Sequence, residues 1–174
     1  MNRSRLEQLL TALSQISRDR ELVMIGSQAV HAVTSDVPDD VLISRECDVL
    51  LDDHDPLVST IDDQLGRDSP SAAESFVHVD TVSSSFPFLP DGWEQRLVPF
   101  GPAAPHLRCL EIHDLVLSKL AAGRLKDYEL IAVLLDRKLA DLTTVRDRIS
   151  AVPDLHMRAV LGARLQIVLE GGPR

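Results

Sequence analysis

The chain has 174 residues, of which 44% are hydrophobic and 26% charged, a composition typical of a globular protein rather than a disordered one. Its net charge of -9 and its aromatic content of 3% argue against a protein that coats nucleic acid, because such proteins need basic surfaces and aromatic rings for stacking. The length fits one domain, or one domain with a helical appendix.

The two cysteines, Cys47 and Cys109, are too few for a disulfide framework, which favours a reducing compartment. The N-terminus lacks the apolar stretch of a secretory signal, and no apolar run approaches the roughly 20 residues that cross a bilayer. We therefore expect a cytoplasmic protein that has no membrane partner.

Hydrophobic periodicity in the first half of the chain predicts helices and strands in alternation. Leucines at helical spacing indicate the first helix, and short apolar runs indicate the strands. In chain order we expect a helix over 3–18, a strand over 22–25, a helix capped by Ser27, a loop at 38–40, a strand over 46–51, a helix over 55–66, a loose polar segment over 67–75 and a strand over 76–80.

The second half changes from loops and strands to helices. Residues 81–105 are rich in serine, proline and glycine, and after Asp114 the sequence is helical throughout. The fold class is therefore α/β (α+β), a mixed sheet flanked by helices in residues 1–112, with a helical C-terminal part in residues 113–174 packed on it. The expected elements are strands over 96–100 and 107–112 and helices over 115–122, 125–139, 142–149 and 154–169, the last of them followed by Gly171 and Gly172.

The first motif that suggests chemistry is the pair Gly26 and Ser27, between a strand and a helix. Glycine allows a tight turn and a close approach to a ligand, and the exposed N–H groups of the new helix favour a phosphate. Taken alone, the pair is more often an ordinary helix start.

Three acids form the second motif. Glu46 and Asp48 are two residues apart in an apolar strand, so both carboxylates project from one face. Two adjacent like charges are costly unless a cation such as Mg²⁺ lies between them; two solvated acids at a strand end remain equally open. Asp80 on a later strand would supply a third metal ligand, although an aspartate that forms a turn before Thr81 is also common. The histidines lack metal-ligand spacing, and none is assigned to zinc.

This order of Gly-Ser, paired acids and distal acid resembles the nucleotidyltransferase superfamily of the polymerase-beta type. Residues 109–130, CLEIHDLVLSKLAAGRLKDYEL, resemble the helical block of AbiE-type toxin-like nucleotidyltransferases and their bacterial relatives, and Lys119 and Asp127 stand at the matching places. The segment LPDGWEQRLVPF at 89–100 resembles the unit that precedes this block. The resemblance runs from about residue 20 to 138. Glu46 stands where the toxin group more often has aspartate.

The resemblance implies a Mg²⁺-dependent enzyme that transfers a nucleoside monophosphate from a nucleoside triphosphate to a hydroxyl of RNA, a protein or a small molecule. It also implies a toxin with an antitoxin partner. The alternative is a catalytically inactive module that binds a nucleotide or a partner protein, which the long interval from Ser27 to Glu46 favours. The implied catalytic and metal-binding residues are Glu46, Asp48 and Asp80, and the implied nucleotide-binding residues are Gly26, Ser27, Lys119 and Asp127.

Overall fold

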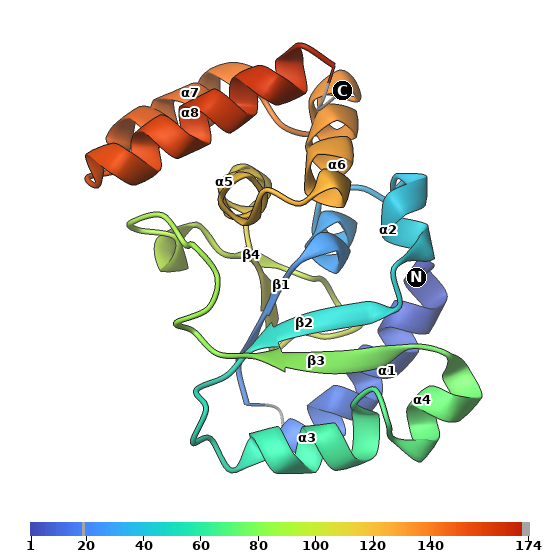
Figure 1. Cartoon of the computed structure of the whole chain (residues 1–174). Helices are drawn as coiled ribbons and strands as arrows, with labels where there is room; N and C mark the ends of the chain where they lie inside the picture. The colour runs from blue at the N-terminus through green and yellow to red at the C-terminus, as the bar shows by residue number, and fades with distance from the viewer. Residues whose placement is uncertain (19, 172–174) are drawn as a thin grey trace. The chain divides into compact units, whose positions relative to one another are not determined.

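The computed structural model describes residues 1–18 and 20–171 and divides into two compact units (Figure 1). The first unit comprises Met1–Phe86 and Leu97–Leu110, and the second comprises Pro87–Arg96 and the chain from Glu111 onward. Each unit therefore contains segments that are not contiguous in the sequence.

The described residues of the first unit form a five-stranded mixed sheet in the order β3-β2-β1-β5-β4. The central strand β1 pairs antiparallel with β2 and parallel with β5. Strand β2 pairs parallel with β3, and β4 pairs antiparallel with β5. The predicted mixed sheet is confirmed. Its strands are β1 (Leu22–Ile25), β2 (Glu46–Leu50), β3 (His78–Val82), β4 (Val98–Pro99) and β5 (Leu107–Cys109).

Helices cover one side of β2 and β3, where α1, α3 and α4 lie in Figure 1. Helix α1 packs on α3, and α3 and α4 pack on β3. The core between these layers consists of leucines of α1 and apolar side chains of the strands, such as Met24, Val49 and Val79, all of them buried. The helical elements of this unit are α1 (Arg3–Ser17), the 3-10 helix η1 (Ser27–Ala32), α2 (Asp39–Ile43), α3 (Leu57–Leu65) and α4 (Pro70–Ser75).

Two segments expected to be irregular are short helices. Residues 67–75 contain α4, because the Ser69 hydroxyl accepts a hydrogen bond from the Ala72 N–H at 3.1 Å and Pro70 occupies the first turn. The loop predicted at 38–40 leads into α2. There the Met1 amine donates a hydrogen bond to the Val41 carbonyl at 2.6 Å, a contact over 40 residues that no local pattern predicts.

Other boundaries differ by a few residues. Ser27 is not the helix cap: Gly26 is the N-cap of η1, and no side chain caps it. Strand β3 begins at His78, because Phe76 adopts a left-handed conformation that ends α4. The expected strand at 96–100 is reduced to β4. Strand β5 ends at Cys109, because Glu111 caps the following helix by accepting the His113 N–H.

The second unit is helical, as the sequence predicts, and Gly172 lies outside the described residues. A buried ion-pair cluster lies in its core: the fully buried Asp114 carboxylate accepts hydrogen bonds from Arg96 at 2.8 and 3.1 Å and from Arg148 at 2.6 Å. In the described part of the chain, no helix is long and apolar enough to span a bilayer. The elements of this unit are η2 (Glu94–Arg96), α5 (Ile112–Ala122), α6 (Leu125–Asp136), α7 (Leu142–Ala151) and α8 (Leu155–Leu169).

Candidate functional site

Strands β2 and β3 bring the acidic residues together. The parallel register pairs Glu46 with His78 and Asp48 with Asp80. Because side chains alternate along a strand, these four project from one face of the sheet, whereas the intervening Cys47 is fully buried on the other face. The face that carries the acids is therefore opposite the helix-covered core.

The Gly26 turn lies directly against Asp48. Gly26 has φ 72° and ψ −171°, a backbone conformation that is essentially restricted to glycine. A Cβ atom at this position would lie 1.8 Å from the Asp48 Oδ2 atom, which is far inside van der Waals contact. Any side chain here would therefore have to displace the Asp48 carboxylate, in addition to straining the turn. The half-buried Ser27 follows as the first residue of η1.

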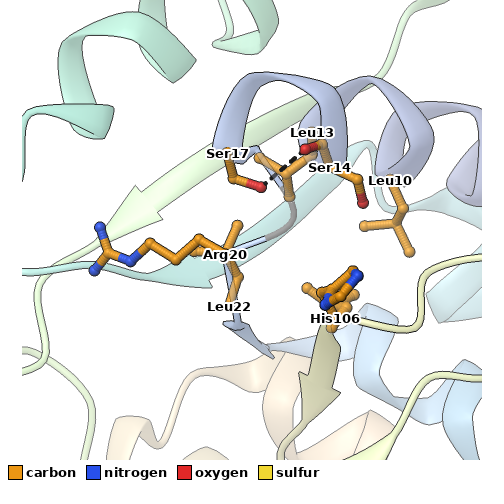
Figure 2. Close-up of a pocket in the computed structure, with 8 residues that line it drawn as sticks. Leu10, Leu13, Ser14, Ser17, Arg20, Leu22 and His106 are labelled. Atoms are coloured by element: carbon orange, nitrogen blue, oxygen red, sulfur yellow. Dashed lines mark hydrogen bonds between the residues drawn. The ribbon is translucent and has the colours of Figure 1, made fainter.

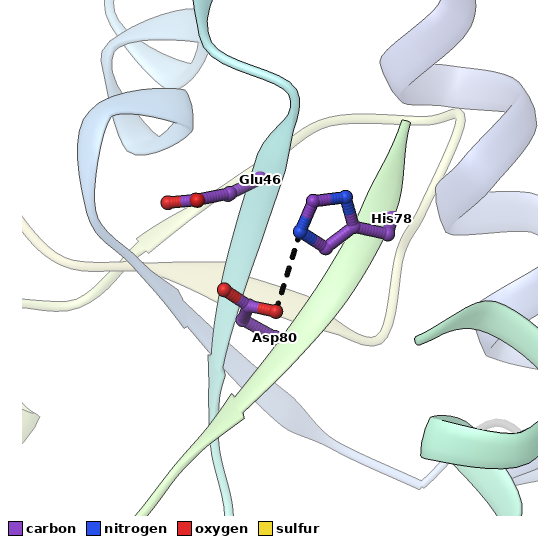
Figure 3. Close-up of side chains that lie close together, drawn as sticks. All are labelled: Glu46, His78 and Asp80. Carbon is purple, nitrogen blue, oxygen red and sulfur yellow. Dashed lines mark ion pairs between the residues drawn. The ribbon is translucent and has the colours of Figure 1, made fainter. Parts of the chain in front are cut away.

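Glu46, His78 and Asp80 form a cluster, shown in Figure 3, where a dashed line marks the ion pair between His78 and Asp80. One potential ligand atom from each residue lies within 4.8 Å of the other two. The His78 Nε2 atom lies 3.3 Å from the Asp80 Oδ1 atom, an ion-pair distance, but the two do not form a hydrogen bond. Among the described residues, this buried nitrogen has no hydrogen-bond partner.

Arg67, in the turn between α3 and α4, supplies a positive charge to the same cluster. One of its guanidinium nitrogens lies 3.0 Å from Glu46 Oε1 and 3.3 Å from Asp80 Oδ2. The charges of Asp80 and then Glu46 raise the pKa of Arg67 above its ordinary value. The side chain is 62% exposed, so solvent can reach this cation.

The donor set fits a divalent metal ion. Carboxylate oxygens are ligands for hard cations such as Mg²⁺, and a neutral imidazole nitrogen is a common ligand for transition metals. Glu46 and Asp80 offer the oxygens, and the Nε2 atom of His78, which forms no hydrogen bond with the described residues, offers a nitrogen. Asp48 stands opposite Asp80 in the register and is the member of the acidic face that contacts the Gly26 turn.

Lys119 and Asp127 lie together in the second unit, with the Lys119 Nζ atom 3.5 Å from Asp127 Oδ1. Asp127 also accepts hydrogen bonds from the side chain of Arg124 at 2.7 and 3.1 Å and from its backbone N–H at 3.2 Å, so it caps α6. Burial alone would raise the pKa of Asp127, but these hydrogen bonds and the Lys119 charge lower it. The structure thus gives Asp127 a helix-capping role, while nucleotide binding by this pair stays a prediction.

Two surface hollows of the first unit are lined by residues other than the acids of this cluster. The hollow in Figure 2, beside Ser17, Arg20 and His106, has a volume of about 10 Å³, room for about one water molecule. A second hollow of about 390 Å³ is lined by residues that include Arg5 and Arg45. Among the described residues that line them, neither hollow includes an acidic side chain.

Sequence reasoning missed two residues of this site. His78 is two residues before Asp80 in one strand, so its place on the acidic face was predictable, but the lack of a second histidine at ligand spacing kept it off the list of candidates. Arg67 gave no signal, because it lies in a turn and reaches the acids only through the tertiary packing of α3 on β3.

Comparison with protein-family models matches residues 4–159 to a family described as nucleotidyltransferase of unknown function (DUF6036). No curated protein and no solved structure matches the chain.

Proposed function

The chain belongs to this nucleotidyltransferase family, and on that premise we propose that it transfers a nucleoside monophosphate from a nucleoside triphosphate to an acceptor hydroxyl with the help of Mg²⁺. The acceptor is RNA, a protein or a small molecule. The likeness of residues 109–130 to AbiE-type proteins supports the further proposal of a toxin that an antitoxin partner restrains.

One observation carries the proposal: the β2–β3 register places Glu46, Asp48 and Asp80 on one face of the sheet, and the Gly26 turn lies against Asp48. Three carboxylates on one face repel one another unless a cation binds, and this repulsion favours a metal. Magnesium, when bound there, neutralises phosphate charge and lowers the pKa of the acceptor hydroxyl.

The residues of the chain have separate roles in this proposal. Gly26 leaves the carboxylate of Asp48 in place and brings the N–H groups at the start of η1 near the triphosphate. Ser27 offers a hydroxyl and an N–H to a phosphate oxygen. For the second unit, the proposal is that Lys119 binds a phosphate group as a point charge and that Asp127, 3.5 Å away, holds the lysine side chain in position.

Binding is tested first, by isothermal titration of the full chain with each nucleoside triphosphate, with and without Mg²⁺. We expect magnesium-dependent binding in the wild type and its loss in Asp48→Ala. The matched control is Asp63→Ala, which removes an exposed aspartate of α3 outside the cluster. Equal binding by the wild type and Asp48→Ala would place the ligand site elsewhere.

Transfer is tested with nucleoside triphosphates labelled at the α-phosphate, incubated with RNA, protein and small-molecule acceptors. Label should pass to one acceptor class in the wild type and in Asp63→Ala, but not in Asp80→Asn. For the role of Lys119, Lys119→Ala should weaken triphosphate binding, whereas Lys126→Ala, at an exposed lysine of α6, should not.

The inactive module is the second candidate, and Arg67 is the observation that favours it. A guanidinium that already bridges Glu46 and Asp80 offsets one of their two negative charges without any metal. Nucleotide binding without transfer to any acceptor would support this candidate and withdraw the enzymatic proposal.

A further inference from the structure

We propose that Glu46, His78 and Asp80 bind a divalent transition-metal ion through a mixed oxygen and nitrogen ligand set, and that Arg67 occupies the cation position until the metal displaces it. This inference rests on the proposed function for the use of the metal in nucleotide transfer. The choice of ligands rests on the geometry of the cluster alone.

His78 is the buried member of the cluster. The residue is 7% exposed, and its Nε2 atom is buried without a hydrogen-bond partner among the described residues. A buried polar atom without a partner costs free energy, so such atoms are rare in folded proteins. Here the nitrogen points at the Asp80 carboxylate, 3.3 Å away (Figure 3), and a bound cation would use the lone pair of a neutral imidazole.

The potential ligand atoms of Glu46, His78 and Asp80 lie close together. Glu46 and His78 are directly paired across β2 and β3, and Asp80 follows His78 by two residues on the same face. Each of the three offers an atom within 4.8 Å of the other two. Two rigid, paired strands therefore preorganise the ligands, which long flexible loops would not do.

Arg67 supplies a positive charge to two of the three proposed ligands. Its guanidinium nitrogen contacts Glu46 at 3.0 Å and Asp80 at 3.3 Å, so a positive charge already lies between these two carboxylates. The side chain is 62% exposed on a turn, and it can swing into solvent without disturbing the core. Arg67 and a metal ion therefore compete for the same two acids.

The ligand types indicate the class of metal. An all-oxygen site suits Mg²⁺, which rarely takes imidazole, whereas a site with one imidazole and two carboxylates suits Zn²⁺, Co²⁺ or Mn²⁺. His78 thus makes this site more selective for transition metals than the three acids alone would be. The selectivity depends on a single side chain, so it can be tested by a single substitution.

The experiment is isothermal titration of the full chain, after treatment with a chelator, with ZnCl₂, MnCl₂ and MgCl₂ in separate runs. His78→Gln removes the nitrogen ligand and retains a polar side chain. Arg67→Ala removes the competing cation at an exposed position, where the truncation leaves the core intact. The matched control is His156→Gln, which removes an exposed histidine of α8.

We expect His78→Gln to weaken Zn²⁺ binding by about tenfold or more while Mg²⁺ binding changes by less than about threefold. Arg67→Ala should increase the affinity for both metals by roughly two- to fivefold, which corresponds to the free energy of an exposed ion pair. His156→Gln should change neither. Unchanged Zn²⁺ affinity in a folded His78→Gln variant, or no tightening in Arg67→Ala, would overturn the proposal.

The outcomes also separate this inference from the proposed function. Zn²⁺ binding that depends on His78 in a chain that transfers no nucleotide would keep the metal site and contradict the enzymatic proposal. Magnesium-dependent nucleotide binding, with no effect of His78→Gln on the affinity for any metal, would support the proposed function and contradict the mixed-ligand metal site. Visible absorption of the Co²⁺ complex gives an independent readout, because loss of the nitrogen ligand shifts its bands.

Discussion

Gly26→Ala is the substitution for which the structure makes the sharpest prediction. With φ 72° and ψ −171°, the backbone of Gly26 lies in a region that costs other residues about 1–3 kcal/mol. The new Cβ atom would also lie 1.8 Å from Asp48 Oδ2, so the carboxylate must move by about an ångström or leave its rotamer, at a further cost of about 0.5–1.5 kcal/mol. We expect the free energy of unfolding to fall by about 1.5–4.5 kcal/mol.

Urea denaturation followed by circular dichroism measures this loss of stability. A double-mutant cycle with Asp48→Ala separates the cost of backbone strain from the cost of the clash with the carboxylate. In the Asp48→Ala background the carboxylate is absent, so Gly26→Ala should cost only the backbone strain of about 1–3 kcal/mol. Gly162→Ala is the control, for which we expect the free energy of unfolding to rise rather than fall. Gly162 lies within α8, nothing lies within 4 Å of its added Cβ atom, and alanine should stabilise the helix by roughly 1 kcal/mol.

The refuting result is an equal cost of Gly26→Ala in both backgrounds. It would mean that the Asp48 carboxylate does not lie against the turn. The described position of Asp48 on the acidic face would then be wrong. A neutral effect of Gly26→Ala would in addition contradict the backbone conformation.

Other predictions concern buried charges and thiols. Asp114→Ala should lower the free energy of unfolding by about 3–5 kcal/mol, because Arg96 loses both of its hydrogen bonds to a carboxylate and Arg148 retains only Glu111 among the described residues; an unchanged urea midpoint would contradict this. The lowered pKa of Asp127 means that its stabilisation is complete above the ordinary value of 3.8 and is lost as the pH falls through the lower folded value, so acid unfolding should depend less on pH in Asp127→Asn. Burial raises the pKa of the Cys47 thiol, and that of Cys109 to about 12, so a thiol reagent should label both only after denaturation; rapid labelling of the native chain would argue against this core.

The sheet was predictable from the sequence where apolar runs and alternation are strong. The first strand was located to the residue, and the second to within one residue, because its acids alternate with Cys47 and Val49, which are buried. The fold class follows from the same pattern. The short helices were not predictable: α4 begins at a single cap, Ser69, and α2 receives hydrogen bonds at its Val41 carbonyl from the distant Met1 and Gln28.

The site was predictable only in part, because a strand pattern gives the face of a side chain but not its neighbours. The spacing of Glu46 and Asp48 placed both on one face, whereas the pairing of Asp48 with Asp80 depends on the register of two distant strands. Arg67 reaches the acids from a turn, so only the folded chain reveals it. Nucleotide binding by Lys119 rests on resemblance and stays a prediction.

The two units interleave along the chain, and this order has a consequence for protein synthesis. The first unit needs β5, at residues 107–109, beside β1, at residues 22–25, so its sheet stays open until the ribosome has released about 110 residues. Residues 87–96 emerge earlier, but the Asp114 carboxylate that binds Arg96 follows them. A chain cut after residue 112 would therefore retain a segment of the second unit whose Arg96 guanidinium lacks its Asp114 partner, and we expect chaperones to bind such a fragment before it can fold.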